Sequence, residues 1–180
     1  LDPPIFEYNG NIKDDNEVYS IVINQKRQPQ TISDLKTVKQ LVLKRYNEYL
    51  SLNGKLENIT QLNKKNANRS ELDTLKGCYK NGCDVLNALK TTLVANAGKC
   101  PYCQIHGGLN KRDHYLPKAI FAEFSIFSLN LVPTCDICNE IKPEQVFNQT
   151  GRRIIHPYYD QINNHRFLFA ELSIHDNAPV

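Results

Sequence analysis

Four cysteines in two close pairs are the residues of this 180-residue chain best suited to chemistry. Cys100 and Cys103 form one C-x-x-C sequence, Cys135 and Cys138 form a second, and 31 residues separate the pairs. Each pair places two thiolates on one tight turn, a spacing that suits one tetrahedral Zn²⁺ and is unusual for disulfides. We therefore expect a structural zinc site with these four ligands, and a reducing compartment such as the cytoplasm.

The remaining cysteines and the nearest histidine fit this site less well. Cys78 and Cys83 lie five residues apart, and we interpret them as buried helical thiols in preference to a second metal site. His106 follows the first pair and could replace one ligand, but four thiolates already complete a tetrahedron.

Polar residues between and beside the pairs have the types that phosphodiester chemistry needs. Asp113 and Asn139 offer oxygen donors, and Mg²⁺ typically takes one or two such ligands together with waters and substrate phosphate. His114 follows Asp113, and an imidazole with its ordinary pKa of about 6.5 can accept a proton from water at neutral pH. Asn130 is a candidate polar anchor for the histidine loop. An isolated Asp-His pair is most simply a hydrogen-bonded loop pair, but the position of this one favours a functional role.

The stretch CPYC…RDHYLPK…NLVPTCDICNEIK, within residues 100–143, resembles the HNH, or ββα-metal, nuclease motif with a four-cysteine zinc site. The family order is Asp-His, a central Asn, and a His or Asn nine residues later, and Asn130 and Asn139 are nine apart. The resemblance implies that His114 is the general base, that Asp113 and Asn139 hold a catalytic Mg²⁺ or Mn²⁺, and that Asn130 supports the histidine loop. Asn139 stands where many members have His.

The resemblance also implies a local structure. Asp113-His114 should end the first strand of a hairpin, Leu131-Val132 should lie on the second strand, and a short helix should begin near Cys138. Lys142, one turn beyond Asn139, should then face phosphate.

The implied activity is metal-dependent hydrolysis of phosphodiester bonds, with double-stranded DNA as the expected substrate. The wider phrase DHYLPK…FAEFSIFSLNLVPTCDICN resembles a bacterial subgroup linked to defence against phage. Two alternatives remain open for this activity. The protein is either a restriction enzyme that acts alone or a defence effector that a partner such as an ATPase switches on. The competing hypothesis is a non-catalytic zinc module that binds nucleic acid or a partner protein. The expected phosphate-binding residues are Arg112, Lys118, Lys142, Arg152 and Arg153.

The charge is unevenly distributed along the chain. The net charge is only +3, but residues 36–80 carry ten basic and four acidic groups. Contact with a polyanion and a lysine-rich solvated helix face explain this excess equally well. His156 lies close to Arg152 and Arg153, where it could face phosphate, although we favour a packed loop histidine.

Periodicity predicts helices before the cysteines and irregular structure after them. Apolar spacing predicts one helix from Thr31 to Asn53-Gly54, a second helical stretch through 56–66 and on to 70–79, and a third over 83–97 that ends at Gly98. Residues 1–30 are predicted to form a strand or an extended arm, and the alternating run 167–174 a strand.

Together with the HNH resemblance, which implies the nuclease unit, these patterns predict an α+β protein with a helical bundle followed by a zinc-stapled ββα nuclease unit. The expected division is an N-terminal arm and helical region over 1–98 and an HNH nuclease domain with a C-terminal extension over 99–180. Phe121, Phe124 and Phe127 are expected to form the apolar cover of that unit. With 41% hydrophobic residues and no apolar run of about 20 residues, we expect a soluble protein with no membrane partner.

Overall fold

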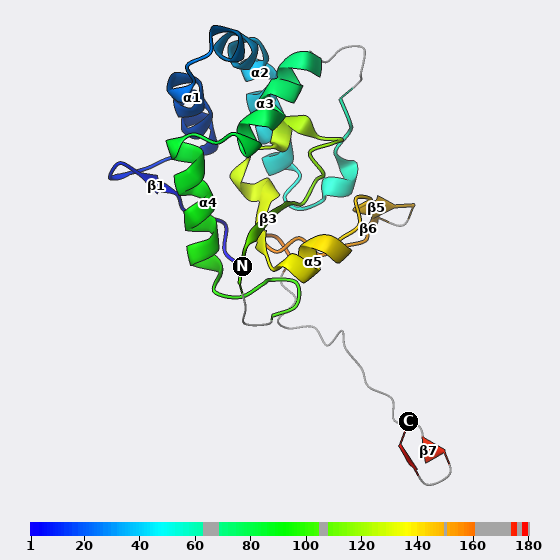
Figure 1. Ribbon diagram of the computed structural model, residues 1–180. Helices are drawn as coiled ribbons and strands as arrows, with labels where there is room; N and C mark the ends of the chain where they lie inside the picture. The colour runs from blue at the N-terminus through cyan, green and yellow to red at the C-terminus, as the bar shows by residue number, and fades with distance from the viewer. Residues whose placement is uncertain (63–68, 105–107, 150, 161–173, 176–177, 180) are drawn as a thin grey trace.

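The computed structural model describes residues 1–62, 69–104, 108–149 and 151–160, and the backbone of 174–175 and 178–179 (Figure 1). Short antiparallel strand pairs accompany a mainly helical chain. The helices are α1 (Asp15–Gln25), α2 (Pro29–Ser51), α3 (Arg69–Lys80), α4 (Asp84–Ala97) and α5 (Asp136–Ile141), with 3₁₀ turns at Leu56–Asn58, Ala122–Phe124 and Ser128–Asn130. The strand pairs are β1 (Glu7–Tyr8) with β2 (Asn11–Ile12), β3 (Lys111–His114) with β4 (Leu131–Thr134), β5 (Phe147–Asn148) with β6 (Gly151–Arg152), and β7 (Ile174–His175) with β8 (Ala178–Pro179).

Helix α2 is the central element of the core, as its apolar period predicts. Its buried apolar residues recur three or four positions apart, which places them on one face. At the C-terminal end of that face, Tyr46 stacks on Phe127 with ring centroids 4.3 Å apart, and Tyr49 meets Phe124 edge-on at 5.1 Å. The phenylalanine cover predicted for the ββα unit therefore packs directly against the helical region. The buried apolar residues of α2 are Leu35, Val38, Val42, Tyr46 and Tyr49.

The prediction of a strand or extended arm over residues 1–30 is wrong for residues 15–25, which form α1. Strands β1 and β2 are present in this segment, but the β-branched run EVYSIVIN lies in the helix. A capping box starts this helix: the Glu17 N–H donates to Asp14 Oδ1 at 2.8 Å, and the Asp14 N–H donates to Glu17 Oε2 at 3.1 Å. Burial of Val18 and Val22 on one helical face then outweighs the β preference of these residues.

The second predicted helical stretch is only partly present. Residues 70–79 lie within α3, but residues 56–62 form one 3₁₀ turn followed by chain without regular structure. The buried guanidinium of Arg45 donates to the Thr60 carbonyl at 2.6 Å, and Leu56 and Ile59 are buried, so this segment is held by tertiary contacts rather than by helical hydrogen bonds. Residues 63–66 of the prediction fall outside the described residues.

The remaining helix predictions hold. Helix α2 is followed by Asn53 and Gly54, both with positive φ, and a Cβ at Gly54 would lie 2.8 Å from the Cβ of Tyr159. Helix α4 ends at Gly98, also at positive φ, just before the first cysteine pair. Of the predicted C-terminal strand 167–174, only Ile174 falls within the described residues, and it begins β7.

The hairpin and the following helix occupy the predicted positions. Strand β3 ends at His114, and it pairs antiparallel with β4 so that His114 lies opposite Leu131 and Asp113 lies opposite Val132. Helix α5 begins at Asp136, two residues before Cys138. The order strand, strand, short helix is therefore present.

One hydrophobic cluster runs through both halves of the chain. It joins apolar residues of α1 to α4 to those of the 115–132 region and to Tyr158. The predicted boundary at residue 98 marks the end of α4 but does not divide the core. None of the helices in the described residues has the length and apolarity needed to cross a membrane.

Candidate functional site

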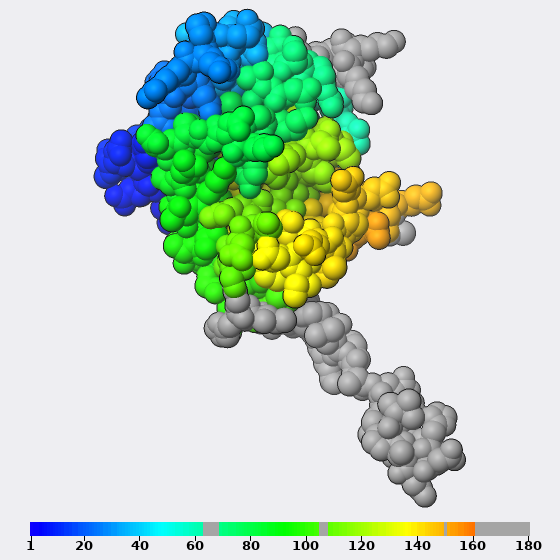
Figure 2. All heavy atoms as spheres, viewed as in Figure 1, coloured from blue at the N-terminus to red at the C-terminus, as the bar shows by residue number. Residues whose placement is uncertain are grey.

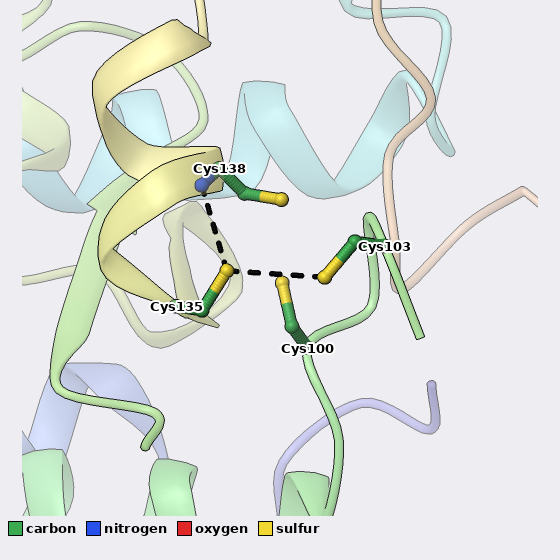
Figure 3. A group of neighbouring side chains, drawn as sticks. All are labelled: Cys100, Cys103, Cys135 and Cys138. Atoms are coloured by element: carbon green, nitrogen blue, oxygen red, sulfur yellow. Dashed lines mark hydrogen bonds between the residues drawn. The ribbon is translucent and has the colours of Figure 1, made fainter. Parts of the chain in front are cut away.

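The four cysteines converge on one point, as their spacing predicts (Figure 3). Their sulfur atoms all lie within 4.8 Å of one another, and the Sγ atoms of Cys103 and Cys135 are 3.8 Å apart. Sulfurs bound at about 2.3 Å to a tetrahedral Zn²⁺ are separated by roughly 3.8 Å, so the cluster has the size of a zinc site. Cys100 and Cys138 are buried, and Cys103 and Cys135 are half-buried. The four cysteines therefore have the arrangement of a possible metal-binding site, consistent with zinc.

The electrostatics of the cluster also favour a cation. Burial would raise the pKa of Cys100, but backbone N–H groups, chiefly that of Cys135, lower it to about 7. Burial and the neighbouring thiols raise the pKa of Cys138. Four adjacent thiols cannot all ionise without a compensating positive charge, which a zinc ion supplies. Cys135 also caps α5, because its sulfur accepts the Cys138 N–H at 3.5 Å.

His114 is buried at the end of β3, with its ring orientation fixed by one backbone carbonyl. Its Nε2 lies 3.0 Å from the Ser125 oxygen. A carbonyl oxygen can only accept, so Nε2 carries the hydrogen and Nδ1 is the basic nitrogen of the neutral ring. Burial, together with the charges of Lys118, Lys142 and Lys90, lowers the pKa of His114 to about 4. The imidazole is therefore neutral at pH 7 with Nδ1 as its acceptor, but the ordinary pKa of about 6.5 expected from the sequence is wrong, because burial makes the ring a weaker base.

Asp113 is paired with Lys142, the residue expected to face phosphate. The Lys142 Nζ lies 3.0 Å from Asp113 Oδ2, and it also donates to the His114 carbonyl at 3.1 Å. Among the described residues, no hydrogen bond of good geometry reaches the buried Oδ2, so the ion pair alone compensates it. Burial raises the pKa of Asp113, and Lys142 opposes that shift. A buried carboxylate oxygen of this kind suits a hard cation.

Asn130 is fully buried and ties the two ends of the loop between β3 and β4. Its Oδ1 accepts the Leu116 N–H at 2.8 Å, while its Nδ2 donates to the Leu116 carbonyl at 3.1 Å and to the Phe124 carbonyl at 3.2 Å. Phe124 precedes Ser125, whose carbonyl orients His114. The side chain therefore anchors the loop that holds the histidine ring.

Three of the four catalytic candidates share one cleft of about 510 Å³, whereas Asn130 is fully buried and does not line it. Asp113, His114 and Asn139 all line it. Helix α4 and helix α5, which border the hairpin, lie on the same face of the molecule in Figure 2, where their surfaces are green and yellow. The structure brings three of the five predicted phosphate-binding residues to this cleft, namely Arg112, Lys118 and Lys142.

The other two predicted phosphate-binding residues lie elsewhere. Arg152 makes a two-pronged ion pair with Asp160, at 2.9 and 2.7 Å, and a longer one with Glu57 at 3.5 Å. Arg153 donates to the Gln145 carbonyl at 3.4 Å. Neither arginine lines the cleft that contains His114.

His156 is a packed core residue, in line with the interpretation favoured from the sequence. It is fully buried, and its Nδ1 accepts the Tyr158 N–H at 3.2 Å. Nε2 therefore carries the hydrogen and donates to the Tyr49 hydroxyl at 2.8 Å. Burial lowers the pKa of His156 to about 3.

Two residues of the helical region belong to the cleft although sequence reasoning missed them. Tyr79 on α3 places its ring edge-on to the His114 imidazole, with centroids 4.4 Å apart, and its hydroxyl donates to the Arg112 carbonyl at 2.9 Å. Lys90 on α4 also lines the cleft. Both occupy ordinary positions in amphipathic helices, and no local motif singles them out.

Comparison with known proteins gives a partial likeness to a phage protein. No protein-family model matches the chain, and no solved structure matches it. The curated Protein ea31 of Escherichia phage lambda is 43% identical over 70 residues, which are 38% of this chain and 24% of that protein. The chain thus spans about a quarter of the length of this relative.

Proposed function

We propose that the protein is a metal-dependent endonuclease of the HNH type that hydrolyses phosphodiester bonds, with double-stranded DNA as substrate. The observation that carries the proposal is the His114 ring. A backbone carbonyl holds its Nε2, so Nδ1 is the unprotonated nitrogen of the ring, and His114 lines the same cleft as Asp113 and Asn139. A base with a fixed tautomer is what activation of a water molecule requires.

In this mechanism His114 accepts a proton from water as the water oxygen attacks phosphorus. The Ser125 carbonyl keeps the ring in place, and Asn130 keeps that carbonyl in place through the adjacent Phe124. Asp113 and Asn139 would hold a Mg²⁺ or Mn²⁺ ion, which when bound stabilises charge on the phosphate and on the leaving 3′-oxygen. The buried Asp113 oxygen, compensated only by Lys142 among the described residues, supports such a ligand role.

The basic lining of the cleft supports a nucleic acid substrate. Arg112, Lys118 and Lys142 surround His114 with positive charge, which attracts a phosphate backbone without regard to base sequence. The four-cysteine cluster joins the chain before β3 to the start of α5, at the end of the hairpin opposite His114.

The test is nicking of supercoiled plasmid by the purified protein with and without added Mg²⁺ or Mn²⁺. We expect cleavage only with the cation, and loss of cleavage in His114→Ala with unchanged zinc content and circular dichroism. Cleavage by His114→Ala at the wild-type rate would refute the assignment of the base. Activity of the protein alone favours a restriction-type enzyme, and activity only with an ATPase partner favours a regulated defence effector.

One observation favours a second candidate, a zinc module that binds nucleic acid or a protein without cleaving. The Lys142 ammonium lies 3.0 Å from Asp113 Oδ2, where it already neutralises the carboxylate. Mn²⁺ titration followed by electron paramagnetic resonance separates the two candidates. A nuclease should bind Mn²⁺ in a manner that Asp113→Asn weakens, whereas the module should not bind it.

A further inference from the structure

Two lysine side chains from different elements converge on the ring of Tyr79. The Lys90 ammonium, from α4, lies 4.2 Å from the ring centroid, and the Lys118 ammonium, from the loop after β3, lies 4.8 Å from it. Each contact is an attractive cation–π interaction. The same ring meets the His114 imidazole edge-on at 4.4 Å, so both ammonium groups are held beside the candidate base.

This arrangement concentrates positive charge. Lys111, Arg112 and Lys142 line the same cleft, where the acidic residues are Asp113, already paired with Lys142, and Glu144. Burial and the surrounding cations lower the pKa values of both Lys90 and Lys118. Convergence of like charges opposes folding, and an anion placed among them would relieve it.

We propose that Tyr79, Lys90 and Lys118 form a phosphate clamp through which the helical region binds the nucleic acid backbone beside the scissile bond. The inference rests on the proposed function for the identity of the polyanion, but not for the presence of the site. The ring of Tyr79 is the platform of the clamp, and the two ammonium groups are the ligands for phosphate oxygens. The helical region then supplies part of the active site and does not only buttress the hairpin.

The geometry also explains how the clamp is kept rigid. The Tyr79 hydroxyl donates to the Arg112 carbonyl on β3, and Lys90 donates to the Tyr79 carbonyl. The Arg112 Nε in turn donates to the Lys90 carbonyl at 3.0 Å. These bonds tie α3, α4 and β3 together around the cleft, so the ammonium groups are positioned before a ligand arrives.

The test measures binding of a fluorescent 30-base-pair duplex to the zinc-loaded protein without added Mg²⁺ or Mn²⁺, at several salt concentrations. Lys118→Met and Lys90→Met keep the aliphatic stem and remove the charge. The control is Lys44→Met, since Lys44 is exposed on α2 and outside the cleft lining. Each clamp variant should weaken binding roughly 5- to 10-fold and reduce the slope of log K against log salt by about 1, while the control changes neither.

A thermal unfolding scan distinguishes binding from support of the fold. We expect Lys118→Met to unfold at the wild-type temperature or above, because the substitution removes like-charge repulsion. If Lys90→Met does not fold, because it loses the bond to the Tyr79 carbonyl, Lys118→Met decides alone. A fall in Tm of more than about 5 °C for Lys118→Met would make that lysine structural and overturn the clamp.

The failure of this inference is separable from the failure of the proposed function. If duplex binding depends on Lys118 but the protein never cleaves, the clamp is supported and the proposed nuclease activity is refuted. If the protein cleaves but Lys118→Met and Lys90→Met bind the duplex as Lys44→Met does, the clamp is overturned and the proposed nuclease activity stands. Competition by polyglutamate as strong as that by duplex at equal charge would assign the site to an acidic protein and overturn it as well.

Discussion

Replacement of Asn130 by alanine should destabilise the protein by about 3–5 kcal/mol. The side chain is fully buried and makes three hydrogen bonds, to the N–H and carbonyl of Leu116 and to the carbonyl of Phe124. Each buried backbone group left without a partner costs about 1–3 kcal/mol, and water entering the new cavity recovers part of that cost. The loop should also loosen around Ser125, so the proposed nuclease activity should fall together with stability.

The assay is urea unfolding at constant zinc, followed by circular dichroism. With a slope of about 2 kcal/mol per molar urea, the expected loss moves the midpoint down by roughly 2 M. Asn110→Ala is the matched control, because Asn110 is exposed and makes one side-chain bond to Asp136 at 3.0 Å, and it should cost no more than about 0.5 kcal/mol.

Asn130→Asp tests the direction of these bonds. The aspartate can still accept from the Leu116 N–H but turns a carboxylate oxygen toward two carbonyl oxygens, so at pH 7 it should be at least as unstable as Asn130→Ala. An Asn130→Ala protein within about 1 kcal/mol of wild type would refute the anchoring role of this residue.

Three further predictions concern the metal, a buried ion pair and a buried histidine. Cys135→Ser should lose zinc and the cooperative unfolding transition together, measured by metal analysis and circular dichroism, because zinc binding is coupled to folding. Arg45→Met should lower the free energy of unfolding by about 3–5 kcal/mol, because it leaves the Glu123 carboxylate, only 1% exposed, without its partner at 2.9 Å. The double variant Arg45→Met, Glu123→Leu should be more stable than Arg45→Met, because the buried carboxylate is then absent as well. Equal urea midpoints for the single and double variants would contradict this. His156 has a pKa of about 3 in the folded protein, so the unfolded chain binds its proton first as pH falls from about 6.5. The contribution of this group to the free energy of unfolding should therefore decrease by roughly 1.4 kcal/mol per pH unit as pH falls from about 6.5 to about 3. Over that range the stability difference between wild type and His156→Gln should shrink. A stability difference that does not change with pH would show that His156 does not titrate as described.

Much of the candidate site could be predicted from the sequence because its determinants are local. In a C-x-x-C turn the local backbone fixes the distance between the two sulfurs. Two such motifs were therefore enough to predict that Cys100, Cys103, Cys135 and Cys138 form one cluster. The ends of β3 and the start of α5 were likewise marked by residues at fixed spacing. The apolar period of α2 and the glycine at the end of α4 determined those helices.

Other features were decided by contacts between distant segments, which no local pattern encodes. The run after Asp14 has strand-forming residues, yet a capping box and burial of one face make it helical. Apolar spacing predicted a helix over residues 56–62. The structure instead has a 3₁₀ turn there, and the Arg45 guanidinium binds the Thr60 carbonyl. Arg152 looked available for phosphate but is neutralised by Asp160, whereas Tyr79 and Lys90, which carry no motif, lie beside His114. The sequence by itself determined the four-cysteine cluster and the positions of the hairpin strands, because both depend on short-range spacing. Only the tertiary structure decided which charges remain unpaired in the cleft, because that depends on the partners that folding brings from far along the chain.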